Sequence, residues 1–268
     1  MLIFNCTKAA ADFFTVTRKG VKQSPLQPKP PIPINQPNTP EQPLSSWLVH
    51  VIKVQRKNIV IAMHIEHRYA MVFCGLKKGD WQGFTTQLIE RLFNNMQFFG
   101  EAFDLCDEVS FHAMLDRFIS DHGQPYFCQR GDPSTQSHLN DVVWHFENKA
   151  HQSGTLPVGR QEGFFDKFVN HLIRTAKHRP KHFFPDQEMF TEWISRYSEH
   201  NDIQHVIGDA FKHLRRHGFE PKPNIDIDEA LASIQNNIAD SHATPPLDSA
   251  LLPDNVICFA SAKNKRKH

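Results

Sequence analysis

The stretch Trp47–Leu76, WLVHVIKVQRKNIVIAMHIEHRYAMVFCGL, holds three apolar runs rich in Val and Ile. Each run is too short for an ordinary helix, and the polar segments QRKN (55–58) and EHR (66–68) separate them. We therefore predict an antiparallel meander of three strands. Both alternating faces of the first strand are largely apolar, so helices should cover the resulting sheet.

The chain has 268 residues, which is long enough for a core domain and an appended part. Hydrophobic residues make up 40% of it, so the apolar area suffices for a buried core. The formal charge of +1 gives no overall attraction to nucleic acid or to an acidic membrane. Any electrostatic contact with a partner must therefore be local.

The five cysteines occur singly, without a CxxC pair or a zinc-finger spacing. An odd number of cysteines argues against a complete disulfide framework, and the first residues, MLIFNCTKAAADFF, lack the pattern of a signal peptide. No apolar run approaches the roughly 20 residues of a membrane-spanning helix. We expect a cytoplasmic protein that has no contact with a membrane.

Before the meander, the pattern predicts a strand at Leu2–Cys6 and a short helix at 8–14. The segment Ser24–Pro43 then carries eight prolines. Proline fixes φ and removes a backbone donor, so we predict an extended, polyproline-like connector. The alternative is that this segment is a ligand for an aromatic groove.

After the meander, Asp80 is a good N-cap for a helix that ends near Gly100, and a second helix is predicted at 107–122. The segment PYFCQR (125–130) predicts one more strand. Asp132 and Pro133 then form a cap and first-turn pair that opens a third helix. These elements make up a predicted α+β domain at about 1–150.

The part at about 156–245 has the pattern of a helical unit, with no convincing strand before the tail at 246–268, which ends in basic residues. The expected helices lie at about 161–177, 186–200, 202–217 and 226–240. The predicted fold class is therefore α+β: an antiparallel β meander covered by helices, followed by a mainly helical C-terminal part.

Three stretches carry a resemblance to a known family: WLVHVIKVQRKNIVIAMHIEHRYAMVFCGLKK, DPSTQSHLNDVVWHFENK and LIRTAKHRPKHFFPDQEM. Together they resemble a bacterial family, domain of unknown function 6933, over about residues 1–190. The family pattern Arg-Ser-x-x-Gly-x-x-Asn-Asp is matched here by Ser134, Asn140 and Asp141, whereas Pro133 and Ser137 stand in the Arg and Gly places. The resemblance implies a bacterial origin and domain bounds, but no activity.

Six polar residues of the meander and the third helix are candidates for a pocket: His64, His67, Ser134, His138, Asn140 and Asp141. At the helix start, free N–H groups could hold an anion, although ordinary capping explains Ser134 equally well. His213 and His217 are spaced i, i+4, but a catalytic metal needs a third ligand and an activating acid. We expect no metal site and no cofactor.

Basic residues form two local clusters in the helical half. If a helix ran through Pro180, Arg174, Lys177 and Lys181 would share one of its faces. The candidate contacts are Arg174, Lys177, Arg179, Lys181, Lys212, Arg215 and Arg216. Such residues indicate either a surface for nucleic acid or an acidic protein, or simply a solvated face.

The absence of a catalytic motif beside these basic clusters favours a non-enzymatic interaction or regulatory protein that contacts nucleic acid or an acidic protein partner. The alternative is a hydrolytic or metal-assisted enzyme that uses the His and Asp residues near the meander and the helix start at 132–141. A deep pocket at the six candidate residues would favour the enzyme, and a shallow basic face would favour the binding protein. The sequence specifies no oligomeric state.

Overall fold

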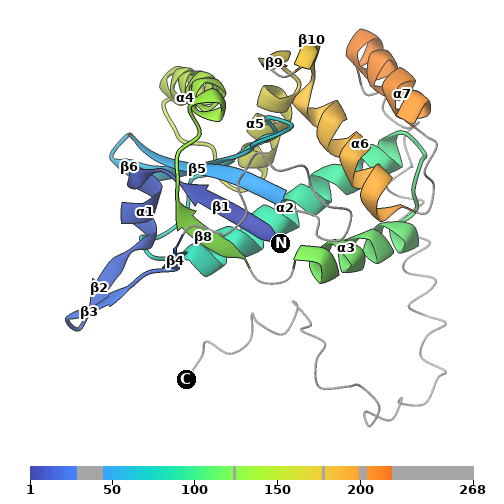
Figure 1. The fold of residues 1–268 in the computed structure, drawn as a ribbon. Coiled ribbons are helices and arrows are strands. Elements are labelled where there is room, and N and C mark those ends of the chain that lie inside the picture. Colours follow the sequence, from blue (N-terminus) through green and yellow to red (C-terminus); the bar gives the residue numbers. More distant parts are fainter. Residues whose placement is uncertain (29–44, 123–124, 177–178, 199–203, 219–268) are drawn as a thin grey trace, which may run out of the picture. The chain divides into compact units, whose positions relative to one another are not determined.

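The computed structural model describes residues 1–28, 45–122, 125–176, 179–198 and 204–218 (Figure 1). Residues Met1–Gly218 form one compact unit. The helix expected at 226–240 and the tail at 246–268 lie outside the described residues. Within the compact unit, the predicted α+β class is confirmed.

The apolar stretch at 47–76 forms three antiparallel strands, as predicted. They are β5 (Ser45–Val54), β6 (Lys57–His64) and β7 (Ala70–Phe73). Opposite residues such as Val51 and Val60 pair directly across β5 and β6. Since successive side chains of a strand point to opposite faces, each strand supplies apolar side chains to both sides of the sheet.

Three further strands extend this meander in a parallel direction. The predicted strand β1 (Leu2–Cys6) pairs in parallel with β5 on one side and with β8 (Tyr126–Gln129) on the other, and β4 (Leu26–Gln27) pairs in parallel with β8. The six strands have the order β4-β8-β1-β5-β6-β7. The sheet is therefore mixed. The prediction of an extended connector at 24–43 is wrong at its start, because Leu26 and Gln27 pair with β8. Residues 29–44 lie outside the described residues.

Helices cover both faces of the sheet (Figure 1). On one side, a single core includes residues of α1 (Lys8–Phe14), α2 (Trp81–Ala102), α3 (Glu108–His122), α6 (Pro185–Tyr197) and α7 (Gln204–His217). On the other side, a second core includes residues of α4 (Pro133–Ser153) and α5 (Arg160–Asn170). Trp47 and Val49 of β5 belong to the first core, and Leu48 between them belongs to the second. The alternation of β5 thus decides which residue enters which core.

The predicted helix starts are confirmed at α2 and α4. The side chain of Asp80 accepts a hydrogen bond from the Gly83 N–H, and Asp132 accepts one from the Thr135 N–H at 2.7 Å. Pro133 occupies the first turn of α4, where its missing N–H would have had no partner inside the helix. The helix ends before Gly154, whose φ of 68° suits glycine.

The helix expected at 161–177 is shorter than predicted. It corresponds to α5, which ends at Asn170, and the chain then forms a hairpin of β9 (Arg174–Ala176) and β10 (Arg179–Phe183). The prediction that no strand precedes the tail is therefore wrong. The residues after His171 pair in the hairpin instead, and Arg174 of β9 forms an ion pair with Asp141 of α4, so contacts with distant residues override the local helical pattern.

Helices after residue 150 share both cores with the elements before it. Phe190 of α6 and Phe211 of α7 lie in the same core as Phe99 of α2, with 5.0 Å between the ring centroids of Phe99 and Phe211. On the other face, Phe165 of α5 packs with Phe146 of α4. Helices on both sides of the expected boundary near residue 150 are thus part of the unit Met1–Gly218.

The outer edge of β7 is covered by side chains of α5 instead of another strand. Glu162 accepts from the Cys74 N–H at 2.7 Å, Asp166 accepts from the Val72 N–H at 2.9 Å, and Asn170 accepts from the Ala70 N–H at 2.7 Å. The Asn170 amide also donates to the Ala70 carbonyl at 2.7 Å. The backbone of this edge strand is therefore paired by a helix, which protects it from pairing with another chain.

Leu88 tests whether α2 covers the meander. Its side chain is fully buried in the first core, so Leu88→Ala should lower the free energy of unfolding by about 2–5 kcal/mol. Chemical denaturation measures this loss. A change within about 0.5 kcal/mol, the range of surface sites, would contradict the packing.

Asn170 tests the covered edge. Asn170→Asp keeps the shape but replaces the amide donor by a buried carboxylate that faces the Ala70 carbonyl, so we expect a loss of about 3 kcal/mol or more in the free energy of unfolding. Asn140→Asp, the same change at an exposed position of α4, is the matched control and should stay within about 0.5 kcal/mol. Equal effects of the two variants in denaturation experiments would rule out the edge pairing as a source of stability.

Candidate functional site

His64 and His67 stack on each other in the turn between β6 and β7. Their ring centroids are 4.9 Å apart with an interplanar angle of 10°, and the His67 N–H donates to His64 Nδ1 at 3.2 Å. Both side chains are buried. Burial, followed by the neighbouring His67, holds the pKa of His64 well below its usual range, so His64 is neutral at pH 7.

Arg68 joins this turn to the start of α4. Its guanidinium donates to the hydroxyl of Thr135 at 2.8 Å and to that of Ser134 at 3.1 Å. The Arg68 side chain is buried, so two hydroxyls replace part of the water that a guanidinium would otherwise bind. Ser134, one of the residues that match the family pattern, is thus a partner of a buried arginine.

Arg174 forms the second buried arginine contact with α4, through an ion pair with Asp141. Its side chain is 5% exposed, and Nε and Nη2 have no hydrogen-bond partner among the described residues. Burial lowers the pKa of His138, and the charges of Arg68 and Arg174 lower it further. Asp141 therefore serves to neutralise a buried cation.

Two arginines contact members of the predicted pocket set. Arg68 connects the turn of His64 and His67 to Ser134. Arg174 pairs with Asp141, and the charges of both residues influence the pKa of His138. Asn140, by contrast, is exposed. These contacts describe a polar junction between the meander and α4, held by two arginines.

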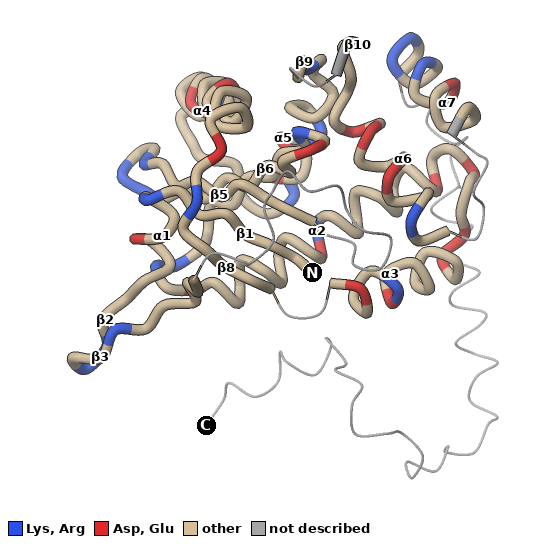
Figure 2. Tube along the Cα trace, in the orientation of Figure 1, with Lys and Arg blue, Asp and Glu red and all other residues tan. Residues whose placement is uncertain are grey.

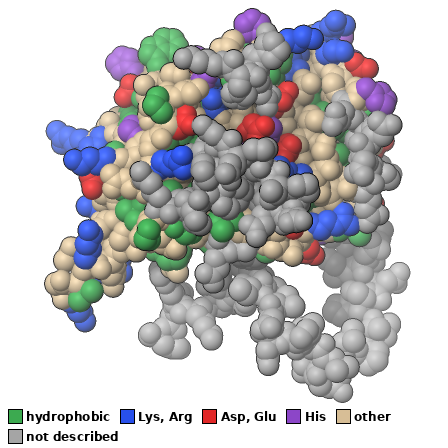
Figure 3. Space-filling view, viewed as in Figure 1, with side chains coloured by type: hydrophobic (Ala, Val, Ile, Leu, Met, Phe, Trp, Pro, Cys, Tyr) green, Lys and Arg blue, Asp and Glu red, His purple; other side chains and the backbone are tan. Residues whose placement is uncertain are grey.

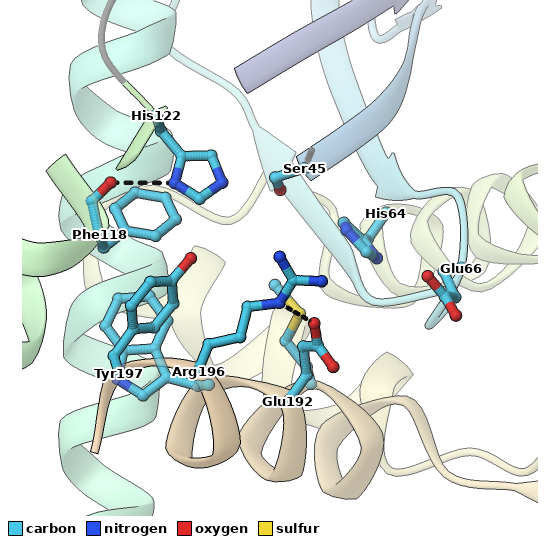
Figure 4. A pocket seen from close by; sticks show the side chains of 10 residues that line it. Ser45, His64, Glu66, Phe118, His122, Glu192, Arg196 and Tyr197 are labelled. Atoms are coloured by element: carbon cyan, nitrogen blue, oxygen red, sulfur yellow. Dashed lines mark hydrogen bonds and ion pairs between the residues drawn. The ribbon is translucent and has the colours of Figure 1, made fainter. Parts of the chain in front are cut away.

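A small pocket opens beside His64, between the sheet and helices α3 and α6 (Figure 4). Arg196 extends into it from α6 and pairs with Glu192. The pocket is lined by Ser45, His64, Glu66, Phe118, His122, Met189, Glu192, Trp193, Arg196 and Tyr197. It encloses about 30 Å³, the space of a few water molecules. Of the six predicted pocket residues, His64 alone is among those that line it.

No group of three or more His, Cys, Asp or Glu side chains in the described ranges could hold a metal ion. His213 and His217 do lie side by side, with ring centroids 4.6 Å apart. Both are exposed on α7. Their i, i+4 spacing thus supplies two imidazoles without a third ligand in this part of the chain.

Two of the predicted basic contacts are engaged inside the fold. Arg174 is buried in the β9–β10 hairpin, so it does not share a helix face with Lys181 as the sequence suggested. Arg215 is 15% exposed, pairs with Asp186 at 3.2 Å and lies 3.6 Å from the ring centroid of Phe184. Arg174 and Arg215 therefore stabilise the fold and are not available to contact a phosphate.

The other predicted basic contacts have different surroundings. Lys181 and Arg216 are exposed, and exposed Lys212 pairs with Asp209 at 2.8 Å. Arg179 lies in β10, and Lys177 is outside the described residues. Three exposed cations therefore remain of this set in the described part of the chain.

A larger group of exposed cations lies elsewhere, and the sequence analysis missed it. Residues 1–28 and 45–79 carry ten Lys or Arg residues and two acidic residues, Asp12 and Glu66. Nine of the ten are exposed and together are called the basic end: Lys8, Arg18, Lys19, Lys22, Lys53, Arg56, Lys57, Lys77 and Lys78. Blue segments mark Lys and Arg at the hairpin of β2 (Val16–Arg18) and β3 (Val21–Gln23) and at the β5–β6 turn, on the left of Figure 2.

Both hairpins of the basic end present a cation in an unusual backbone conformation. Lys19 has φ of 48° between β2 and β3, and Arg56 has φ of 65° between β5 and β6. Tight hairpin turns need such positive φ values, and Gly or Asn supplies them at lower cost. The turns thus carry Lys or Arg at positions where backbone geometry alone favours other residues.

Buried His122, which lines the pocket, should make the free energy of unfolding depend on pH. Burial lowers the pKa of His122 to about 4 in the folded protein, so the unfolded chain binds the proton first as pH falls below about 6.5. The stability due to neutral His122 is therefore present above about pH 6.5 and is lost toward pH 4. Between about pH 7.5 and about pH 5, the wild type should lose roughly 2 kcal/mol more unfolding free energy than His122→Asn. Parallel pH curves in denaturant titrations would contradict this assignment.

None of the helices in the described ranges is both long enough and apolar enough to cross a bilayer. No curated protein and no solved structure matches the chain. A family model described as a domain of unknown function, DUF6933, matches residues 3–188, which include every strand of the sheet and helices α1 to α5. The chain therefore belongs to the DUF6933 family.

Proposed function

We propose that this protein is a non-enzymatic binding or regulatory protein whose basic end contacts the phosphate backbone of nucleic acid. One observation carries the proposal: nine exposed Lys and Arg residues gather in segments that contain two acidic residues. Phosphate contacts by exposed cations release counterions from the nucleic acid, which favours binding regardless of base sequence.

The distribution of charge supports this assignment better than the total charge does. The whole chain has a formal charge of +1, so the excess of cations at the basic end is balanced by acidic residues in the rest of the protein. A surface with one sign of charge attracts an oppositely charged polymer over about one Debye length, roughly 8–10 Å in physiological salt. The electrostatic attraction should therefore direct a polyanion to the basic end of the protein.

The two hairpins favour a nucleic acid over a small acidic ligand. Lys19 and Arg56 stand at the tips of separate turns, and neither lies among the residues that line the pocket beside His64. Cations spread over projecting turns match a repeated phosphate backbone, whereas a small anion needs donors that converge on one point.

The same proposal includes a bacterial origin and a cytoplasmic location. The resemblance of the three sequence stretches to a bacterial family supports the origin. Cys6, Cys74 and Cys106 are free thiols, and burial raises the pKa of Cys74 to about 12, so this thiol stays protonated. Unpaired thiols are the usual state of cysteine in the reducing cytoplasm.

The β5–β6 turn provides the direct test of nucleic-acid binding. Lys53→Ala, Arg56→Ala and Lys57→Ala in one variant remove three exposed cations. We expect weaker binding to duplex DNA in fluorescence anisotropy, with the slope of log affinity against log salt reduced by up to about 2.7. These side chains are exposed, so the melting temperature should hardly change.

The matched control removes three exposed cations from the other candidate surface: Lys181→Ala, Lys212→Ala and Arg216→Ala. It has the same change in net charge but leaves the basic end intact, so its salt slope should equal that of the wild type. A reduced slope in the control and an unchanged slope in the turn variant would move the contact to α7 and β10. No binding by the wild type at low salt would refute the proposed function.

A further inference from the structure

A groove of about 640 Å³ lies between α4 and α5, on the face of the sheet opposite to α2. It is lined by Lys149, Gln152, Ser153, Thr155, Pro157, Gln161, Phe164, Phe165 and Phe168. This volume is within the range of sites that hold a drug-sized group, such as one or two nucleobases. No acidic residue is among those that line the groove.

Two aromatic side chains that line the groove are exposed to solvent and do not belong to either core. Phe164 is 68% exposed and Phe168 is 50% exposed, whereas their neighbour Phe165 is buried against Phe146. Exposed Trp144 extends the aromatic surface, because the His145 ring lies 4.8 Å from Trp144 and 5.5 Å from Phe168 between centroids. Figure 3 shows hydrophobic side chains at the surface over α4.

The groove adjoins the basic end through a specific contact. Gln55, in the β5–β6 turn, donates from its amide to the Ala150 carbonyl of α4 at 3.2 Å. Lys149 precedes Ala150 and lines the groove, and Arg56 follows Gln55 at the tip of the turn. Cations for phosphates and aromatic faces for bases thus occur on neighbouring elements.

This combination distinguishes single-stranded from duplex nucleic acid. In a duplex the base faces are stacked on each other, so a Phe ring in a groove cannot reach them without disrupting the helix. In a single strand the faces are free, and stacking on an aromatic side chain contributes to binding of any base. A protein segment could also fill an apolar groove. The groove lining includes a lysine and no acidic residue, and the adjacent turn carries further cations, so its charge complements a polyanion.

We infer that the groove between α4 and α5 binds bases of a single-stranded nucleic acid, by stacking on Phe164 and Phe168, while the β5–β6 turn contacts its phosphates. The inference rests on the proposed function and adds the class of nucleic acid. Lys149 extends the row of cations from the turn into the groove. The protein should therefore bind a single strand more tightly than a duplex of the same length.

The double variant Phe164→Ala and Phe168→Ala tests the stacking. Fluorescence anisotropy at low salt, with a labelled thymidine oligonucleotide of about 12 nucleotides, should show at least about tenfold weaker binding than the wild type. Binding to a duplex of the same length should change less than about twofold, and the salt slope should stay the same because no cation is removed.

The control for surface apolarity is Val109→Ala with Ile119→Ala, which shortens two exposed side chains of α3 in the other layer of helices. It should leave both affinities unchanged, and thermal melting checks that both variants remain folded. Duplex and single-strand binding reduced equally by the Phe variant, or an unaffected single strand, would overturn the groove assignment.

The two proposals fail in different ways. If the Lys53, Arg56 and Lys57 variant loses affinity and the Phe variant does not, the basic end binds nucleic acid and the groove has another occupant, such as a protein segment. If the wild type binds neither oligonucleotide, both the proposed function and the stacking site are refuted.

Discussion

The edge of β7 is the constraint on which the second layer of helices depends. Glu162, Asp166 and Asn170 are spaced i, i+4 and i+8 on α5, and they pair with the N–H groups of residues 74, 72 and 70. Four helical residues rise about 6 Å, and two strand residues advance about 6.6 Å, so one helix face can follow alternate N–H groups of a strand. This match fixes both the position and the direction of α5 along the sheet.

Arg91 connects this edge to the opposite layer. From α2 it donates to the Val72 carbonyl at 2.7 Å, contacts Glu162 at 3.3 Å and forms an ion pair with Asp166. Burial raises the pKa of Asp166 to about 6 in spite of the cation, which still leaves the carboxylate ionised at pH 7. Because α5 already pairs the N–H groups of residues 70, 72 and 74, this edge of the sheet is protected from pairing with another chain.

Buried arginines have a second role at the junction of the meander and α4. Arg68 binds the hydroxyls of Ser134 and Thr135, and Arg174 pairs with Asp141. Ser134 and Asp141 are two of the three positions that match the family pattern, and both serve as partners of these cations. Ser134 and Asp141 therefore have a structural role at this junction, whereas the third matching residue, Asn140, is exposed.

Periodicity and capping residues predicted part of the local structure. Alternating apolar runs identified the meander, and Asp80 and Asp132 located two helix starts, because these signals depend on neighbours within one or two turns. The excess of Lys and Arg over Asp and Glu in residues 1–79 is also present in the sequence, but the predicted basic contacts all lay in the helical half. The hairpin at 174–183 was missed because a short helix and a short strand have similar patterns when apolar residues are few.

Contacts between distant residues were decided only by the tertiary structure. Parallel pairing of β1 with β5 and β8, the cover of β7 by α5, and the burial of Arg174 join residues that lie up to 123 positions apart, and no local pattern encodes such pairs. The same reason separates the two classes of basic residue. Arg174 and Arg56 carry the same charge, but Arg174 of β9 meets the carboxylate of Asp141 in α4, whereas Arg56 is exposed to solvent. The sequence determined which groups carry charge and which segments alternate, and the packing of sheet and helices determined which of them remain free to bind.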